Sequence, residues 1–285
     1  MTAEILDGRA LSRTIAEEIA QQVQAFQSAH GRVPGIAVVQ VGEDPASAWY
    51  VRQIERSFKR AGMEFALHTL PADAQAEDLV GLLKKLNADE RTNGIIVQMP
   101  LPEHLPQTLV TDILDPRKDV DGIHPINAGK LMQGAPDYFA PATPAGGMEI
   151  LKRYHIDLKG KRAVMVGRSN IVGRPMALLM LHQHATVTIC HSRTVDLPAR
   201  CREADILVAA IGKAKMITGD MIKPGAVVVD FGVNVVGDSI VGDVDTEAAM
   251  EVASYVTPVP GGTGPMTNIM LMLNTLEAAR RQAGG

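Results

Sequence analysis

Short apolar runs alternate with longer amphipathic segments along most of this 285-residue chain, and this alternation constrains the fold more than any other feature. Residues Gly35–Val41 are rich in β-branched side chains and predict a strand, whereas residues 9–29 carry apolar side chains at a spacing of four and predict a helix. Strands and helices in repeated alternation are typical of βα units that build a parallel sheet. At roughly 150 residues per domain, the length predicts two domains or one large α/β unit. We therefore expect an α/β fold built on a parallel sheet.

The same reasoning gives further elements along the chain. Strands are predicted at Phe65–Leu70, Gly94–Met99, Lys161–Val166, Thr186–Cys190, Ile206–Ile211 and Ala226–Asp230, and helices at Ser47–Ala61, Glu77–Leu86, Arg174–Gln183 and about residues 268–281. The charged segment Asp115–Gly122 lacks periodicity, and we interpret it as a loop near a domain boundary. A second domain is expected from about Phe139. The Pro/Gly-rich segment TPVPGGTGPMT at residues 257–267 predicts a loop.

Composition excludes several classes of protein. The chain has 28 basic and 32 acidic residues and no basic block with interleaved aromatics, so a nucleic-acid partner is not expected. Its two cysteines, Cys190 and Cys201, form no CxxC motif, and we expect neither a disulfide scaffold nor a metal site. The N-terminus lacks a signal-peptide pattern, and no run approaches the ~18 apolar residues that span a bilayer. We expect a cytoplasmic protein that binds no membrane.

The predicted strand Lys161–Val166 leads into Gly167-Arg168-Ser169 and then, after Gly173, into a helix. A glycine at such a turn lets backbone N–H groups approach a diphosphate, and the helix N-terminus favours its charge. Ser169 replaces the second glycine of the usual G-x-G-x-x-G pattern, so spacing alone leaves a nucleotide site and an ordinary βα turn both open. The strand before, the helix after and a second strand about twenty residues later favour the nucleotide site.

The second strand ends at His191-Ser192-Arg193-Thr194, without an acidic residue. Sites that prefer NAD usually place Asp or Glu there to bind the ribose hydroxyls. Arg193, together with Arg168, is instead suited to pair with a 2′-phosphate. The pattern predicts NADP as the cofactor, and a solvated basic turn is the alternative.

Five motifs occur in order along the chain: VGEDPASAWYV from residue 41, GIIVQMPLP from 94, KDVDGIHPINAGKL from 118, GRSNIVGRPMALLM from 167 and TPVPGGTGPMT from 257. Together they resemble, from end to end, the bacterial FolD family of bifunctional methylenetetrahydrofolate dehydrogenase/methenyltetrahydrofolate cyclohydrolases. The resemblance implies a homodimer of chains with two α/β domains around a cleft. Residues 1–121 and 266–285 would form a folate-binding catalytic domain, and residues 139–257 a Rossmann-like NADP-binding domain.

The resemblance also implies roles for single residues. Tyr50 matches the residue that packs against the folate ring system, Gln98 the active-site glutamine, and Asp121 the acid that hydrogen-bonds the pterin. Asp119 lies close by, but Asp121 is the one that precedes Gly122, as the family motif requires. Further substrate contacts are expected at Pro258, Gly261, Gly262 and Pro265, and NADP contacts at Gly167, Arg168, Ser169, Ser192, Arg193 and Val233.

One position departs from the family motif S-x-x-Y-V-x-x-K, which Ser47, Tyr50 and Val51 match: Ile54 occupies the place of the lysine. Hydride transfer depends on the cofactor and on positioning, whereas hydrolysis needs a titratable group to move protons. The sequence therefore predicts oxidation of 5,10-methylenetetrahydrofolate to 5,10-methenyltetrahydrofolate, without hydrolysis to 10-formyltetrahydrofolate. The alternatives are a bifunctional enzyme that uses another group, such as Lys59, a dehydrogenase for another small substrate, and a non-catalytic folate- or nucleotide-binding paralogue.

Overall fold

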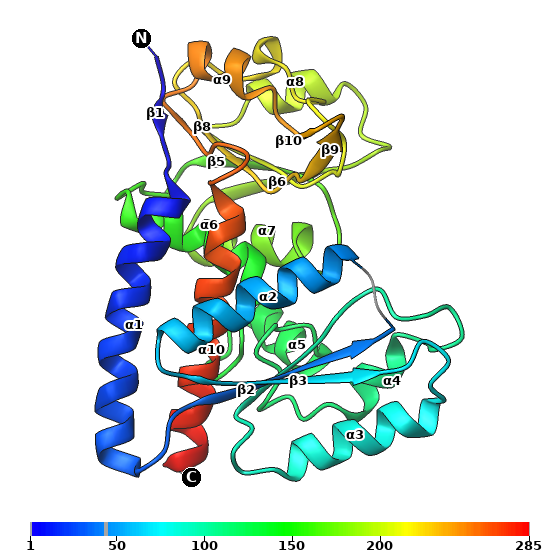
Figure 1. Cartoon of the computed structure of the whole chain (residues 1–285). Coiled ribbons are helices and arrows are strands. Elements are labelled where there is room, and N and C mark those ends of the chain that lie inside the picture. The colour runs from blue at the N-terminus through cyan, green and yellow to red at the C-terminus, as the bar shows by residue number, and fades with distance from the viewer. Residues whose placement is uncertain (1, 43–44, 285) are drawn as a thin grey trace. The chain divides into compact units, whose positions relative to one another are not determined.

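The computed structural model describes residues 2–42 and 45–284, and the side chains of residues 45–47 also lie outside the description. The chain divides into two compact units. Unit 1 comprises Met1–Arg13 and Thr143–Thr267, and unit 2 comprises Thr14–Ala142 and Asn268–Gly285. Both units are α/β structures built on parallel sheets, which confirms the predicted fold class (Figure 1).

Unit 1 is built on a six-stranded parallel sheet in the order β1-β11-β8-β7-β5-β6. Its strands are β1 (Glu4–Ile5), β5 (Arg162–Val166), β6 (Thr186–Cys190), β7 (Ile206–Ala209), β8 (Val227–Asp230) and β11 (Tyr255–Val256), and β9 (Asn234–Val236) and β10 (Ser239–Val241) form a separate hairpin. Its helices are α6 (Ala142–Arg153), α7 (Gly173–His182), α8 (Leu197–Arg202), the 3₁₀ turn η1 (Gly219–Met221) and α9 (Thr246–Val252).

The central strands of unit 1 are near-continuous apolar runs because helices cover both faces of the sheet. Figure 1 shows α8 and α9 on one side and α6 and α7 on the other. Side chains of β5, β7 and β8 such as Val164, Leu207 and Val228 form one buried core with Cys201 of α8 and Ala249 of α9. The strand order reverses at β5, because the chain runs from β5 out to β6 and then crosses back to β7 on the other side. This doubly wound order is the Rossmann-like arrangement that the sequence predicts.

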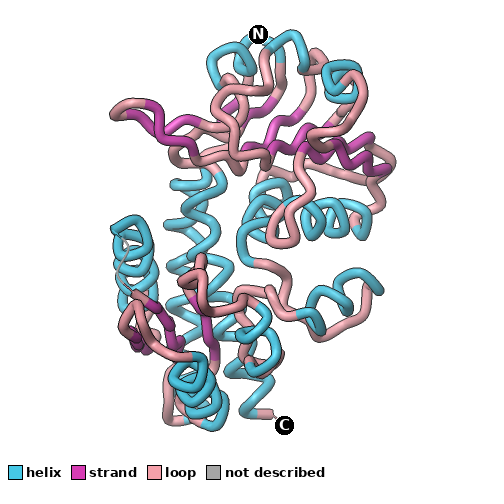
Figure 2. The backbone as a smooth tube through the Cα atoms, turned by 90° about the vertical axis from the view of Figure 1, so that its right-hand side faces the viewer, coloured by secondary structure: helices cyan, strands magenta, loops and turns pink. Residues whose placement is uncertain are grey.

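Unit 2 has a three-stranded parallel sheet in the order β3-β2-β4, with helices around it (Figure 2). Its elements are α1 (Gly8–His30), β2 (Gly35–Val41), α2 (Pro45–Arg60), β3 (Glu64–Leu70), α3 (Ala76–Ala88), β4 (Gly94–Val97), α4 (Thr108–Ile113), α5 (Pro125–Gln133) and α10 (Thr263–Ala283). On one face of the sheet, Val39 and Ile95 pack against Leu79 and Leu83 of α3 and Val110 of α4.

Two long helices run side by side in unit 2 (Figure 1). Arg280 Nη2 of α10 donates a hydrogen bond to Gln22 Oε1 of α1 at 3.0 Å. Helix α10 begins at Thr263, inside the segment that the sequence predicts as a loop, rather than near Asn268. Pro265 is tolerated there because a proline in the first helical turn lacks only an N–H that has no helical partner.

The N-terminal segment also differs from the sequence-based domain boundary, which placed residues 1–121 in one domain. Strand β1 joins the sheet of unit 1 beside β11, and Leu6 N donates to Val256 O at 2.9 Å. A two-residue strand carries no periodicity, and its partner lies about 250 residues further along the chain, so local pattern cannot reveal it. Strands β4 and β7 are also each two residues shorter than predicted.

Candidate active site

Two carboxylates lie two residues apart in the segment between α4 and α5, and their surroundings differ. Asp119 is fully buried, and it accepts hydrogen bonds from the backbone N–H groups of Ile123 at 3.1 Å and His124 at 2.8 Å and from Asn127 Nδ2 at 2.7 Å. Asp121 is half-buried, and no group among the described residues donates a hydrogen bond to its carboxylate. Asp119 therefore fixes the turn into α5, whereas Asp121 is available to a ligand.

Asp121 and Tyr50 are electrostatically coupled. Burial raises the pKa of the Asp121 carboxyl to about 7, and the charge of Asp119 contributes to the shift. Burial also raises the pKa of the Tyr50 hydroxyl, with a second contribution from the charge of Asp121. The coupling shows that Tyr50, on α2, lies near Asp121. An aromatic ring beside a free carboxylate can bind a planar heterocycle, with the ring face against Tyr50 and N–H donors toward Asp121.

Gln98 follows β4 directly, and its backbone N–H continues the ladder by donating to Val39 O at 2.8 Å. Its side chain is 9% exposed, and the Nε2 atom is buried with no hydrogen-bond partner among the described residues. A parallel bridge between Ile95 and Asp119 places Asp121 two residues further on, at the level of the end of β4. Because buried polar groups are nearly always paired, the free donor of Gln98 points to a ligand or water at this end of β4.

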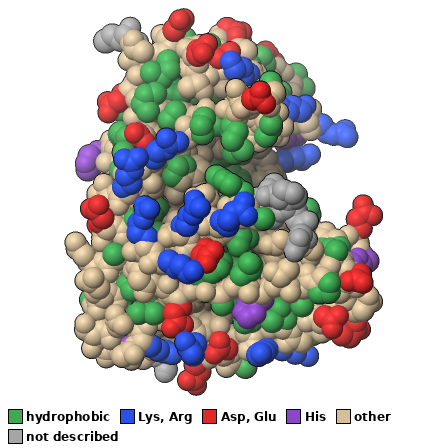
Figure 3. All heavy atoms as spheres, in the orientation of Figure 1, with side chains coloured by type: hydrophobic (Ala, Val, Ile, Leu, Met, Phe, Trp, Pro, Cys, Tyr) green, Lys and Arg blue, Asp and Glu red, His purple; other side chains and the backbone are tan. Residues whose placement is uncertain are grey.

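Ile54 lies one helical turn after Tyr50 on α2 and is completely buried. Arg52, Arg56 and Lys59 are exposed on the same helix, and Figure 3 shows basic side chains gathered on the surface over α2. Lys59 Nζ pairs with Glu55 at 2.6 Å on that exposed surface, away from the buried side of Ile54. Lys59 is therefore poorly placed to supply the amine that position 54 lacks. Ser47 of the same motif has a side chain outside the described residues.

In unit 1, the turn after β5 depends on two glycines. Gly167 has a φ of +131°, and a Cβ atom there would lie 2.2 Å from Ala210 O. A Cβ atom on Gly173, the first residue of α7, would lie 2.5 Å from Gly167 O, so the helix N-terminus is packed directly against the end of β5. This turn lies beside the boundary between β5 and β7, the position at which doubly wound sheets bind dinucleotides.

The remaining residues of the expected cofactor site lie at the same edge of the sheet. Ser169 holds the turn that leads into α7, since its Oγ accepts hydrogen bonds from the N–H groups of Val172 and Gly173, both at 3.2 Å. After β6, the N–H of Arg193 donates to His191 Nδ1 at 3.1 Å, which fixes the turn and leaves the Arg193 side chain exposed. Arg168, Ser192 and Val233 are also exposed, and the part of the chain that the structure describes gives neither Arg168 nor Arg193 an ion pair.

The Pro/Gly-rich segment forms a tight loop before α10. Gly262 N donates to Pro258 O at 2.8 Å, Arg9 N donates to Gly261 O at 2.9 Å, and Gly261 has a φ of +113°. Pro258, Gly261, Gly262 and Pro265 all belong to unit 1, whereas Tyr50, Gln98 and Asp121 belong to unit 2. Within unit 2, Tyr50 lies near Asp121, and Asp121 lies at the level of the end of β4, which Gln98 follows.

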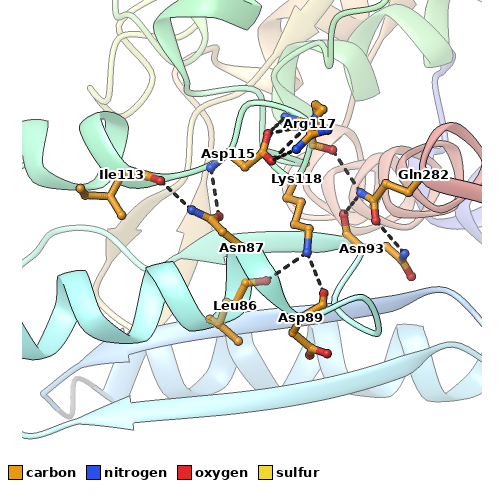
Figure 4. A network of polar contacts seen from close by, with 9 residues as sticks. All are labelled: Leu86, Asn87, Asp89, Asn93, Ile113, Asp115, Arg117, Lys118 and Gln282. Carbon is orange, nitrogen blue, oxygen red and sulfur yellow. Dashed lines mark hydrogen bonds and ion pairs between the residues drawn. The ribbon is translucent and has the colours of Figure 1, made fainter. Parts of the chain in front are cut away.

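Unit 2 also has a separate cavity of about 660 Å³, and several polar side chains in its wall already have hydrogen-bond or ion-pair partners (Figure 4). Lys118 is buried there and donates to Leu86 O at 3.1 Å and Asp89 O at 2.7 Å. Asn87 on the same wall donates to Ile113 O at 2.7 Å. These hydrogen bonds connect the chain before β4 with the segment that leads to Asp119. The network therefore fixes that segment near the start of β4, whereas the candidate site lies at the end of β4.

Comparison with known proteins gives the chain its family. Residues 6–121 match the model of the tetrahydrofolate dehydrogenase/cyclohydrolase catalytic domain, and residues 141–283 match the NAD(P)-binding domain of the same enzymes. The bifunctional protein FolD of Roseiflexus castenholzii is 55% identical over 100% of this chain and 99% of that protein. The crystal structure of FolD from Campylobacter jejuni is 44% identical, with a TM-score of 0.96 over 98% of this chain and 99% of that chain. The chain belongs to the FolD family.

Other structures place this FolD family member among its relatives. The Trypanosoma brucei methylenetetrahydrofolate dehydrogenase-cyclohydrolase, solved with NADP and an inhibitor, is 35% identical with a TM-score of 0.96 over 100% of both chains. A shikimate dehydrogenase from Aquifex aeolicus is 14% identical with a TM-score of 0.52, which shows a shared fold only. Among the described residues, no helix is both long and apolar enough to cross a membrane.

Sequence reasoning missed two buried aspartates that brace the cofactor edge in unit 1. Asp243 accepts hydrogen bonds from the N–H groups of Ile211, Gly212 and Lys213 at 2.5, 3.0 and 2.8 Å, in the loop after β7. Asp230 accepts from Gly232 N at 2.7 Å, from Asp243 N at 3.2 Å and from Val244 N at 2.9 Å, and burial raises its pKa to about 6. Only the place of Asp230 at the carboxyl end of a buried strand gave a sequence signal. These contacts fix the loops after β7 and β8, including the approach to Val233.

Proposed function

We propose that the chain oxidises 5,10-methylenetetrahydrofolate to 5,10-methenyltetrahydrofolate with NADP as the hydride acceptor, as a step of one-carbon metabolism. The observation that carries this proposal is the group formed by Tyr50, Gln98 and Asp121: an aromatic ring, a free amide donor and a free carboxylate at one end of β4. Such a set suits a reduced pterin, whose flat pyrimidine ring carries a carbonyl oxygen and N–H donors.

The two units divide the work in this proposal. Unit 2 binds the folate, with Tyr50 against the ring system, Asp121 accepting hydrogen bonds from the pterin amino and ring N–H groups, and Gln98 beside the reacting part. The resemblance also assigns substrate contacts to Pro258, Gly261, Gly262 and Pro265, which belong to unit 1. Unit 1 binds the cofactor. The family models that match this chain also put a catalytic domain first and an NAD(P)-binding domain second.

The residues of unit 1 fit a dinucleotide. The close approach of Gly167 and Gly173 leaves no room for side chains where the backbone would meet the diphosphate. Arg193, with Arg168, would pair with the 2′-phosphate, and the absence of an acid in residues 191–194 removes the group that favours NAD. Ser192 and Val233 complete the expected contacts, with Ser169 fixing the turn. The nicotinamide ring, when bound, supplies the acceptor for the hydride.

Within this scheme, the chain's own residues bind and orient the substrate. Asp121 and Tyr50 fix the orientation of the ring system. The substrate's own nitrogen lone pair stabilises the cation left after hydride loss. No proton transfer by the protein is required for that step, so a site without a lysine at position 54 can support it. Hydrolysis of the methenyl product needs activated water and a proton carrier. Ile54 supplies neither, and we propose that hydrolysis to 10-formyltetrahydrofolate is weak or lost.

A bifunctional enzyme is the second candidate function. It is favoured by the relatives, which are named bifunctional at 50–55% identity, and by the Asp121 carboxyl, whose pKa of about 7 suits proton transfer near neutral pH.

A family member of this kind is also expected to form a homodimer, which light scattering after size-exclusion chromatography measures directly.

The deciding experiment uses the unmodified protein in two assays. NADPH formation from 5,10-methylenetetrahydrofolate tests the dehydrogenase, and we expect turnover with NADP and little with NAD. Decay of 5,10-methenyltetrahydrofolate with and without protein tests the hydrolysis, and we expect nearly equal rates. Absence of NADPH formation rejects the proposed function and leaves a binding paralogue. Strong protein-dependent hydrolysis rejects the loss of the second activity and establishes the bifunctional enzyme.

A further inference from the structure

Two side chains of unit 2 have a buried polar atom without a hydrogen-bond partner among the described residues: Gln98, at Nε2, and Asn268, at Oδ1. The two atoms are complementary, because an amide N–H donates and a carboxamide oxygen accepts. Gln98 belongs to the candidate site described above. Asn268, in α10, belongs to none of the motif positions to which the sequence assigns a role. Buried polar groups are nearly always paired and are destabilising when they are not, so two unpaired groups in one unit call for an explanation.

The contacts of α10 show which end of the sheet Asn268 reaches. Gln282 Nε2 donates to Arg117 O at 3.4 Å, and Asn274 Nδ2 donates to Val120 O at 2.8 Å. Residues closer to the N-terminus of α10 therefore lie beside later residues of the segment that leads to Asp121. At about 1.5 Å per residue, the six residues from Asn274 back to Asn268 cover about 9 Å in that direction. This distance brings Asn268 to the level of Asp121 or slightly beyond it.

The strand β4 gives the same position independently. A Cβ atom on Gly94 would lie 3.0 Å from Thr275 Oγ1, so this face of β4 is turned toward α10. Gly94 and Gln98 are four residues apart and share that face, since side chains alternate along a strand. Asn268 and Thr275 are seven residues apart and share one side of α10. Seven helical residues cover about 10 Å and four strand residues about 13 Å, so Asn268 and Gln98 lie at similar levels on facing surfaces.

We propose that Asn268 is a specificity-determining residue of the folate site, whose Oδ1 accepts a hydrogen bond from an N–H group of the reduced pterin while Gln98 Nε2 donates to its carbonyl oxygen. The inference rests on the proposed function, because it takes the substrate to be a tetrahydrofolate. A ring with both a donor and an acceptor satisfies the two orphan groups at once. A ligand lacking either group leaves one of them buried and unpaired, which is the physical basis of discrimination.

The test exploits the fact that a ligand-binding group and a structural group affect stability differently. Asn268→Leu keeps the number of side-chain heavy atoms and their branching and removes a polar group that is unpaired in the free protein, so its melting temperature should equal or exceed that of the unmodified protein. Asn274→Leu is the matched control on the same helix. It removes hydrogen bonds to Val120 O at 2.8 Å and Ala140 O at 3.2 Å, so its melting temperature should fall.

Binding is then measured by calorimetry with tetrahydrofolate and with NADP. We expect Asn268→Leu to weaken tetrahydrofolate binding about 3- to 10-fold, the equivalent of one hydrogen bond, and to leave NADP binding unchanged. Asn268→Ala should show the same loss, because the missing acceptor and not steric blocking is responsible.

Three results overturn the proposal: unchanged tetrahydrofolate affinity in Asn268→Leu, affinity restored in Asn268→Ala, or a fall in melting temperature equal to that of the control. If the unmodified protein binds no tetrahydrofolate and forms no NADPH, the proposed function itself fails, and this inference falls with it. Unmodified activity with any of the three results above overturns only the role of Asn268.

Discussion

Replacing each of the two neighbouring aspartates by alanine should separate structure from function. Asp119 is fully buried and accepts three hydrogen bonds at 2.7–3.1 Å. Asp119→Ala would leave those three donors without an acceptor, at about 1–3 kcal/mol for each one that water cannot reach. With partial relaxation we expect a loss of about 3–5 kcal/mol, the usual effect of breaking a buried charged network. For a protein of this size, that loss corresponds to a melting temperature lower by roughly 6–20 °C.

Asp121→Ala should have the opposite profile. No described group donates a hydrogen bond to its carboxylate, and burial, with a smaller contribution from the charge of Asp119, raises its pKa, so removal costs little stability or gives a small gain. Folate turnover should fall severely, while NADP binding stays within about twofold, because the cofactor residues belong to the other unit.

Thermal unfolding by circular dichroism and NADPH formation with 5,10-methylenetetrahydrofolate measure the two effects on the same preparations. A native melting temperature for Asp119→Ala would refute the structural assignment. Equal destabilisation by both substitutions would refute the distinction between the carboxylates. Normal folate turnover by a folded Asp121→Ala protein would remove Asp121 from the site.

Arg193→Ala should weaken NADP binding about 10- to 150-fold, the loss of one charge-assisted hydrogen bond, and leave NAD binding unchanged; equal losses for both cofactors would contradict contact with the 2′-phosphate. Gly167→Ala places a Cβ 2.2 Å from Ala210 O, so we expect a lower melting temperature and loss of NADP affinity, and native values for both would show that the turn is not constrained. Asp121→Asn tests the pKa of about 7. Because this pKa is raised above the unfolded value of about 4, the folded state binds more protons between these values, and the stability of the unmodified protein should fall as pH rises from about 4 to 7. Denaturant melts of the variant should lack that part of the slope, and identical slopes would refute the shift. Ile54→Lys buries an amine, so we expect a lower melting temperature and, where the amine is neutral near pH 7, a gain in hydrolysis of 5,10-methenyltetrahydrofolate over the unmodified protein.

Elements with strong local periodicity could be predicted from the sequence, and elements held by distant partners could not. Strands β2 and β6 have the predicted bounds, and helix α1 extends one residue further at each end than predicted. The β1–β11 pair was not predictable, because two residues pair with a segment about 250 positions away. The start of α10 at Thr263 was hidden by glycine and proline, which usually mark loops but are tolerated in a first helical turn.

The candidate site shows the same division. The turn at Gly167 could be selected from the sequence because it joins a predicted strand to a predicted helix, whereas Tyr50, Gln98 and Asp121 could be selected only because their motifs resemble those of the FolD family. Asp243 could not, because its function depends on bonds to three backbone groups thirty or more residues earlier in the chain. Asn268 carried no sequence signal at all. Its significance arises only from a missing hydrogen bond, which is a property of the folded chain.

The hydrogen-bond state of each buried polar group therefore distinguishes supporting residues from ligand-binding residues in this fold. Asp119, Asp230 and Asp243 each accept at least three hydrogen bonds, and each holds a loop whose backbone groups would otherwise be unpaired. Gln98 and Asn268 each have a buried atom without a partner, and Asp121 has a carboxylate to which no described group donates. A chain whose site served only packing would gain stability by replacing such groups with apolar ones. Position 54 shows that replacement in the buried face of α2, where isoleucine stands in the place of the family lysine. A site that had lost all function would be expected to show the same change at Gln98 and Asp121, which match the family motifs. Their retention beside Ile54 is what a site would show if it still bound a polar heterocycle but had lost its proton carrier, and this combination argues for hydride transfer without hydrolysis.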